Sequence, residues 1–219
     1  SVSIAETTDG VIQSLKSVFG QQLTEWRCIV GDISGVERPD FNDSMWKVVN
    51  PEFEWGHEPV AWFRKTIIIP EKLGGFSTSG QKIVLRVSMD DGGIIYVNGK
   101  NAGIFDWDQG RVVLTESAFP GQRIVVAIMG INTNGPGRIL SARLEVESLA
   151  DLRSKVDSYL AMIKIAKECL GDSKSAIDES VNSIDMKALQ VGDKKRFIDS
   201  IDAATKLLYS LSPKIKEYT

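Results

Sequence analysis

The stretch of sequence that decides the fold is KIVLRVSMDDGGIIYVNG, residues 82–99. Every second residue from position 83 to position 89 is apolar, which is the pattern of a strand with one buried face. The residues DDGG, at 90–93, predict a turn, and residues 94–97 predict the next strand. Asn98-Gly99 then predicts a tight hairpin, because both residues tolerate positive φ angles.

Further strands are predicted on both sides of this hairpin, at residues 62–69, 102–105, 111–114, 123–129 and 139–146. Glycine-rich turns separate them, since 17 of the 19 glycines precede Ser148. No helical stretch between them is long enough to connect two parallel strands. The sequence therefore predicts an antiparallel β-sandwich, preceded by a short helix within residues 11–19.

The chain after Ser148 has a different character, because turn-forming residues become rare and apolar residues recur at helical spacing. Three amphipathic helices are predicted, at residues 149–170, 177–189 and 197–211, the third capped by Asp193. The predicted fold class is mainly β with an α-helical C-terminal segment. The predicted domains are a helical lead-in at 1–25, a β-sandwich at 26–147 and a helical segment at 148–219.

The composition excludes several classes of function. The chain of 219 residues has a formal net charge of −3, which gives no support for binding nucleic acid. With one histidine and two cysteines it cannot form a His/Cys zinc cage or a dense disulfide scaffold. No apolar run reaches 18 residues, so we expect no membrane span. We favour an extracellular or periplasmic location, with any signal peptide already removed before Ser1.

Two sequence motifs resemble a known family. The stretches WFRKTIIIP, residues 62–70, and YVNGK, residues 96–100, are similar to the jelly-roll, galactose-binding-like domain at the N-terminus of many glycoside hydrolases. They resemble family 2 and, at least as closely, the family 38 α-mannosidases. Residues 148–211 resemble the helical segment that leads into the catalytic barrel of family 38, whereas family 2 would continue into an immunoglobulin-like domain. The resemblance therefore favours family 38.

The resemblance implies an accessory function, because family 38 catalysis needs a zinc ion and an aspartate nucleophile in the following barrel. The single histidine, His57, cannot reproduce that zinc site, so zinc is expected only in a catalytic domain outside this chain. We therefore expect a non-catalytic N-terminal region of a glycoside hydrolase, α-mannosidase-like, that supports or positions a catalytic domain. The alternative is a stand-alone carbohydrate-binding module. The expected partner is accordingly the parent catalytic domain or a glycan.

The aromatic residues supply the candidate sugar-binding site. Sugars stack their apolar C–H faces on tryptophan, while carboxylates bind their hydroxyls. Asp106-Trp107-Asp108 combines both groups in a predicted loop, and Trp55 is a second candidate. For Trp107, contact with a ligand and packing against another domain remain equal alternatives.

The carboxylates of Asp90 and Asp91 are a candidate calcium site, with Asp106 and Asp108 as further oxygen ligands. The resemblance adds that galactose-binding-like folds often carry a structural calcium ion. The competing interpretation is that Asp-Asp-Gly-Gly is simply a tight turn, and the pattern favours it.

Cys28 and Cys169 are expected to be two buried free thiols, although a disulfide between them stays open.

Overall fold

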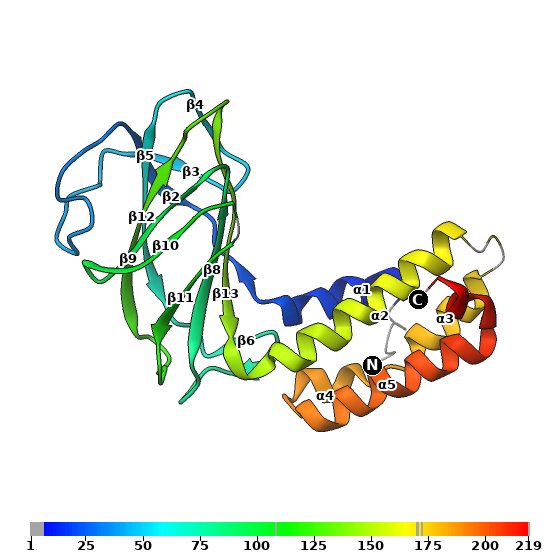
Figure 1. Cartoon of the computed structure of the whole chain (residues 1–219). Coiled ribbons are helices and arrows are strands. Elements are labelled where there is room, and N and C mark those ends of the chain that lie inside the picture. The colour runs from blue at the N-terminus through cyan, green and yellow to red at the C-terminus, as the bar shows by residue number, and fades with distance from the viewer. Residues whose placement is uncertain (1–6, 108, 170, 172, 219) are drawn as a thin grey trace. The chain divides into compact units, whose positions relative to one another are not determined.

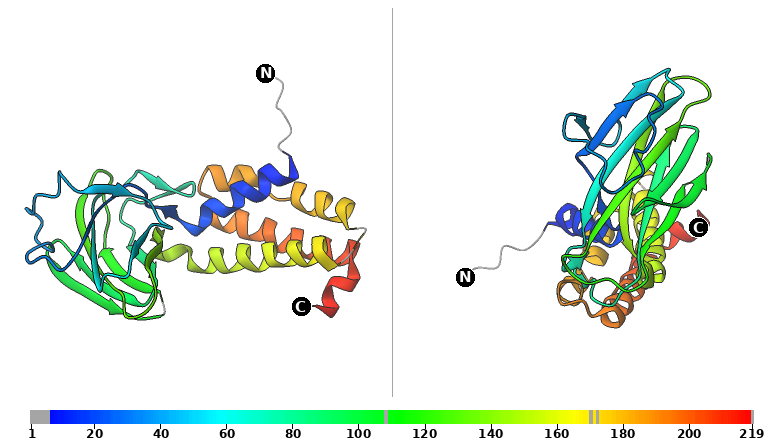
Figure 2. Two further views of the ribbon diagram at one scale, coloured as in Figure 1. Left: turned by 90° about the horizontal axis from the view of Figure 1, so that it is seen from above. Right: turned by 90° about the vertical axis from the view of Figure 1, so that its left-hand side faces the viewer.

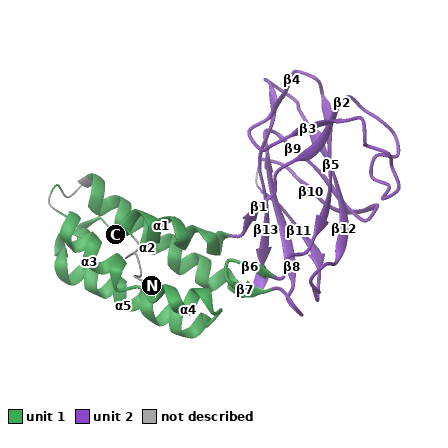
Figure 3. Cartoon of the chain, turned by 180° about the vertical axis from the view of Figure 1, so that it is seen from behind, with its two compact units in different colours: residues 1–19, 72–77, 148–219 green, residues 20–71, 78–147 purple. Residues whose placement is uncertain are grey.

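The computed structural model describes residues 7–107, 109–169, 171 and 173–218 (Figure 1). The chain forms two compact units, coloured separately in Figure 3. The β unit comprises residues 20–71 and 78–147, and the helical unit comprises residues 1–19, 72–77 and 148–219. The change of character at Ser148 is thus a unit boundary. The helical unit, however, also includes the N-terminal lead-in and a short segment from the middle of the β region.

The larger sheet of the β unit has the strand order β10-β9-β12-β5-β2-β3, with every neighbouring pair antiparallel. Its strands are β2 (Trp26–Val30), β3 (Lys47–Val49), β5 (Val60–Ile68), β9 (Gly92–Val97), β10 (Lys100–Phe105) and β12 (Arg123–Ile131). The predicted hairpin joins β9 to β10, with φ angles of 48° at Asn98 and 84° at Gly99.

The second sheet has the order β1-β13-β8-β11, and β4 pairs with β13 beside it. Its strands are β1 (Gln21–Gln22), β4 (Glu54–Gly56), β8 (Ile83–Met89), β11 (Gly110–Thr115) and β13 (Gly137–Val146). Buried apolar side chains fill the space between the two layers, where the ring of Trp55 meets the ring of Phe63 edge-on at 5.6 Å. The predicted antiparallel β architecture is confirmed at this level, while the jelly-roll connectivity stays a prediction.

The outer face of the larger sheet is covered by the loop at residues 31–46, which Arg64 holds in place. Arg64 is 3% exposed and donates hydrogen bonds to the carbonyl oxygens of Val36 and Arg38. Its Nε also donates to Asp43 Oδ2 at 3.0 Å. The sequence suggests an acidic partner for Arg64 on a neighbouring strand; the partner lies instead in this covering loop.

The helical unit has two long helices, α2 (Ala150–Cys169) and α5 (Lys194–Leu211), which run side by side in both Figure 1 and Figure 2. The shorter elements are α1 (Thr8–Leu15), η1 (Lys16–Phe19), η2 (Glu147–Leu149), α3 (Lys174–Asn182), α4 (Met186–Gln190) and η3 (Pro213–Glu217). Asp193 caps α5 as predicted, since its side chain accepts from the N–H of Arg196. No described helix is both long enough and apolar enough to cross a membrane.

The second predicted helix, residues 177–189, is two helices. The carboxylate of Asp185 accepts a hydrogen bond from the N–H of Ala188 and so begins α4 immediately after α3 ends. An aspartate at the N-cap position starts a new helix, because its carboxylate accepts hydrogen bonds from the first backbone N–H groups, which have no partner within that helix.

A two-stranded hairpin of β6 (Lys72–Leu73) and β7 (Phe76–Ser77) completes the helical unit. Gly74 and Gly75 form its tip with φ angles of 57° and 87°. A Cβ atom at Gly74 would lie 2.6 Å from the carbonyl oxygen of Ser17, and one at Gly75 would lie 2.4 Å from that of Leu189. Only glycine therefore allows the tip to approach the helices this closely.

Candidate functional site

The candidate site is a hollow of about 220 Å³ at the end of β9 and β10. We call it the Trp107 hollow, and it is lined by residues 91–93, 104–107, 131 and 133. Its volume is below the about 300 Å³ at which pockets for drug-sized ligands begin. The Trp107 hollow therefore suits one small ring, such as a single sugar unit, rather than an extended ligand.

Two glycines allow the backbone to close around the floor of this hollow. A Cβ atom on Gly92 would lie 2.4 Å from the carbonyl oxygen of Phe105. A Cβ atom on Gly93 would lie 2.6 Å from the carbonyl oxygen of Met129 and 3.2 Å from the Phe105 ring. The glycines of the predicted Asp-Asp-Gly-Gly turn are thus needed for the close approach of β10 and β12 to β9.

Asp91 fixes the wall of the hollow opposite β10. Its Oδ2 accepts hydrogen bonds from the hydroxyl of Thr133 at 2.8 Å, from the backbone N–H of Asn134 at 3.1 Å and from the backbone N–H of Thr133. These three donors hold the pKa of the Asp91 carboxyl below its usual value, the backbone N–H of Thr133 contributing most. Asp91 also has a positive φ of 69°, as the tight-turn interpretation requires.

The open side of the hollow is apolar and exposed. Trp107 is 76% exposed and Ile104 is 73% exposed. The carboxylate of Asp106 accepts a hydrogen bond from the backbone N–H of Trp107 at 2.9 Å, through Oδ1. Among the described residues, Asp106 Oδ2 has no hydrogen-bond partner, so it is free to bind a hydroxyl. Asp108 lies outside the described residues.

These groups together can bind a small ring that is apolar on one face and rich in hydroxyls at its edge. The indole of Trp107 offers a flat surface to C–H groups, and the Asp106 carboxylate and the Thr133 hydroxyl offer acceptors. None of the described residues that line the hollow is a lysine, an arginine or a histidine.

The second sugar-binding candidate, Trp55, lies in the core instead. It is 6% exposed, its ring packs against Phe63, and its indole N–H donates to the carbonyl oxygen of Glu58 at 3.1 Å. The sequence could not reveal this, because the partner ring comes from the other sheet. Next to it, His57 is exposed in the bend between β4 and β5.

Two of the calcium candidates, Asp91 and Asp106, line the Trp107 hollow together, but they belong to no larger acidic cluster in the described part of the chain. There, no group of three or more His, Cys, Asp or Glu side chains is arranged to hold a metal ion. The Asp91 carboxylate is already used by the loop at residues 132–135. Calcium binding stays a prediction.

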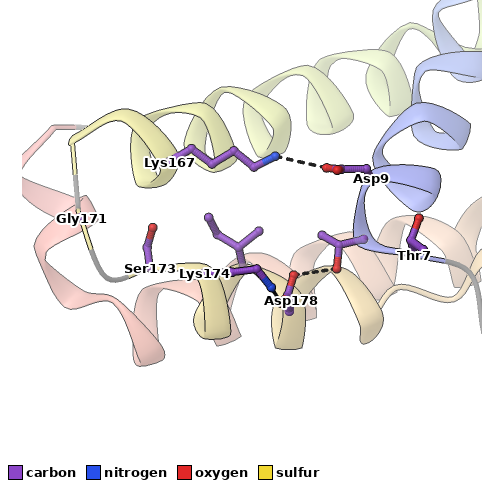
Figure 4. A pocket seen from close by; sticks show the side chains of 9 residues that line it. Thr7, Asp9, Lys167, Gly171, Ser173, Lys174 and Asp178 are labelled. Atoms are coloured by element: carbon purple, nitrogen blue, oxygen red, sulfur yellow. Dashed lines mark hydrogen bonds and ion pairs between the residues drawn. The ribbon is translucent and has the colours of Figure 1, made fainter.

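A cavity of about 500 Å³ in the helical unit lies between α1, α2 and α3 (Figure 4). Its charged side chains are paired within it: Lys167 with Asp9 at 3.5 Å, and Lys174 with Asp178 at 2.9 Å. Thr8 also donates to Asp178 at 2.7 Å. Lys167–Asp9 connects α2 to α1 and Thr8–Asp178 connects α1 to α3, whereas Lys174–Asp178 lies within α3. We interpret the cavity as a helix junction rather than a ligand site.

Comparisons with known proteins were made by sequence and by structure. No family model matches the chain, and no curated protein sequence matches it. Structures similar to the chain are glycoside hydrolases of family 2. A family 2 member from Bacteroides cellulosilyticus has a TM-score of 0.49 and 18% sequence identity, over 57% of this chain and 20% of that one.

Two other glycosidase structures give similar values. Bacteroides uniformis β-glucuronidase 2 has a TM-score of 0.49 and 18% identity, over 57% of this chain and 17% of that one. A β-glycosidase from Bacteroides vulgatus has a TM-score of 0.47 and 18% identity, over 58% of this chain and 20% of that one. This chain thus spans about a fifth of the length of these proteins. The preference for family 38 α-mannosidases over family 2 gains no support from them.

Sequence analysis did not identify Ile104, Phe105, Ile131 or Thr133 as residues of the hollow. Ile104 was detectable, since it lies one strand position before Phe105 and three before the candidate Trp107. Thr133 was not, because it reaches the site only through a hydrogen bond to Asp91 across 42 residues of sequence.

Proposed function

We propose that this chain is a non-catalytic accessory region of a glycoside hydrolase and that it binds a sugar ring in the Trp107 hollow. The observation that carries the sugar-binding proposal is the 76% exposure of Trp107 at the open side of a hollow lined by carboxylates. Trp107 is not an isolated exposed residue, because Ile104 beside it at the same hollow is 73% exposed, and adjoining exposed apolar side chains are typical of a binding surface.

The glycoside hydrolase part of the proposal rests on the two sequence motifs. The first motif lies mostly on β5, and the second runs from the end of β9 through the hairpin turn to the start of β10. Strands β5 and β9 both pair with β12. There the ring of Trp62, from the first motif, packs against the ring of Tyr96, from the second, at 5.8 Å. Residues of the two motifs thus pack against each other on one sheet, which supports reading the motifs as parts of one domain.

A flat pyranose with equatorial hydroxyls suits this surface best, because all its ring C–H bonds are axial and make both faces apolar. Methyl β-D-glucopyranoside is therefore the probe we choose. We expect binding with a dissociation constant on the order of millimolar, as for one small ring on one aromatic platform. Heat of binding measured by calorimetry on the full chain is the test.

Two variants make the test specific. Trp107→Ala should weaken binding about fivefold or more, the loss expected for an aromatic anchor worth about 1–3 kcal/mol. Phe119→Ala is the matched control, because Phe119 is also an exposed aromatic, at 60%, and does not line the hollow. If the glucoside gives no measurable heat of binding, or if Trp107→Ala binds it as tightly as Phe119→Ala does, the sugar-binding proposal is wrong.

The second candidate function is docking of another protein domain on the same surface. It is favoured by the exposure of Ile104 beside Trp107, since two neighbouring apolar side chains in water are typical of an interface. In that case the isolated chain binds no glucoside. Trp107→Ala then weakens its association with the catalytic domain instead.

Neither candidate gives this chain an activity of its own. We expect no turnover of aryl α-mannosides, β-glucosides or β-glucuronides by the chain alone. Turnover that is lost on replacing one of its carboxylates would show that the chain is an enzyme.

A further inference from the structure

The charged side chains that line the Trp107 hollow are all acidic among its described residues. Two carboxylates line it, those of Asp91 and Asp106, and none of its described lining residues is basic. Asp91 is 6% exposed, and its carboxylate is held by three donors from the loop after β12. It therefore stays fixed and negative when a ligand enters.

Resting on the proposed function, we infer that the hollow selects sugars by charge, binding amino sugars best, neutral hexoses next and uronic acids least. A protonated amine on the ring meets the field of both carboxylates and can donate to Asp106 Oδ2. The same amine also interacts favourably with the face of an indole, here that of Trp107. A uronate places a third negative charge among two, with no basic side chain to offset it.

The size of the effect follows from the exposure of the site. Asp106 and Trp107 are exposed, so water and salt screen the charges. Exposed charge pairs are worth about 0.2–1 kcal/mol, so each unit of ligand charge should change the affinity by up to about fivefold at low ionic strength. The differences in affinity between the three sugar classes should be largest in dilute buffer and should decrease when salt is added.

The experiment compares three methyl β-glycosides of one ring configuration at pH 6: the glucosaminide with a free amine, the glucoside and the glucuronide. Calorimetry on the full chain in dilute buffer should rank them in that order. Asp106→Asn should bring the three affinities closer together, because it removes one of the two carboxylates that line the hollow. Asp32→Asn is the matched control, because Asp32 is an exposed aspartate outside the hollow, and it should leave the order intact.

The outcomes separate this inference from the proposal beneath it. If none of the three glycosides binds, the sugar-binding proposal itself fails. If all three bind equally, or the glucuronide binds best, sugar binding stands and the charge selection is wrong. A further arm uses Nα-acetyl-lysine amide, which carries the ammonium without the ring. If it binds as tightly as the glucosaminide, the hollow recognises a basic side chain of a protein, and the inference is overturned.

Discussion

The hydroxyl of Thr133 donates a 2.8 Å hydrogen bond to Asp91 Oδ2 and so joins the loop after β12 to the turn before β9. The backbone N–H groups of Thr133 and Asn134 donate to the same oxygen. One carboxylate oxygen therefore holds two segments that are 42 residues apart in sequence. This junction forms the inner wall of the Trp107 hollow.

The junction should stabilise the β unit. We expect Asp91→Ala to lower the Tm clearly, because three donors lose their acceptor. Asp91→Asn should lower it less, since the amide oxygen still accepts. Asp90→Ala is the control: the described hydrogen bond of Asp90 is made by its backbone N–H to the carbonyl oxygen of Arg138, and the substitution keeps it. Equal Tm values for Asp91→Ala and Asp90→Ala would contradict this account.

Asp91 should also contribute to the dependence of stability on pH. Its pKa is lowered by the three donors, so the charged form is favoured in the folded chain. The contribution is fully present above the ordinary carboxyl pKa of about 4 and is lost as the pH falls through the lowered value. The drop in Tm between pH 6 and pH 2.5 should therefore be smaller for Asp91→Asn than for the unchanged chain.

The hairpin tip in the helical unit should tolerate no side chain. Gly75→Ala puts a Cβ atom 2.4 Å from the carbonyl oxygen of Leu189 at a φ of 87°. We expect a loss of about 1–3 kcal/mol in the free energy of unfolding. Gly80→Ala is the matched control, because its φ is 73° but nothing lies within 4 Å of its Cβ position. The two variants should differ in urea denaturation, and equal losses would mean that the close approach is unimportant.

A chain of buried hydroxyls should stabilise the helical core. Tyr159 donates to Ser180 Oγ at 2.8 Å, and Ser180 donates to the carbonyl oxygen of Ala204 at 2.7 Å. Tyr159→Phe removes one hydrogen bond and should cost about 1 kcal/mol. Ser180→Ala leaves the buried Tyr159 hydroxyl without an acceptor and should cost more, about 1–3 kcal/mol. In urea denaturation the double variant should be no less stable than Ser180→Ala, and a fully additive loss would contradict the coupling.

The thiol of Cys28 should react only when the chain unfolds. It is 4% exposed, and burial raises its pKa to about 12. The thiolate is therefore scarce at neutral pH, and its contribution to stability is lost only as the pH rises from about 9 toward 12. In a Cys169→Ser background, a disulfide reagent at pH 8 should label Cys28 at the rate of global unfolding. Immediate labelling under native conditions would contradict the burial.

Local sequence patterns predicted most of the strands and helices, because alternation and helical spacing are properties of neighbouring residues. The Asn98-Gly99 hairpin and the Asp193 cap are examples. The association of the β6–β7 hairpin with the helical unit was not predictable in this way. It depends on backbone contacts of Gly74 and Gly75 with residues 17 and 189, which no local pattern records.

The candidate site was predicted only in part, because some of its residues belong to a local sequence pattern and others meet only in the folded chain. An aromatic residue beside an acid, as in Asp106-Trp107, is visible in the sequence and leads to the hollow. Whether a tryptophan is buried depends on what packs over it. Trp55 has the same kind of neighbours in sequence as Trp107, yet the ring of Phe63 meets it from the other sheet.

The most direct measurement of the central claim is a sugar titration that follows the indole N–H signals of the five tryptophans by NMR. The Trp107→Ala variant assigns the Trp107 signal. Adding methyl β-D-glucopyranoside should shift that signal saturably and leave the signals of the buried Trp26, Trp55 and Trp62 in place. A saturable shift at one of those three, or no shift at Trp107, would contradict the account.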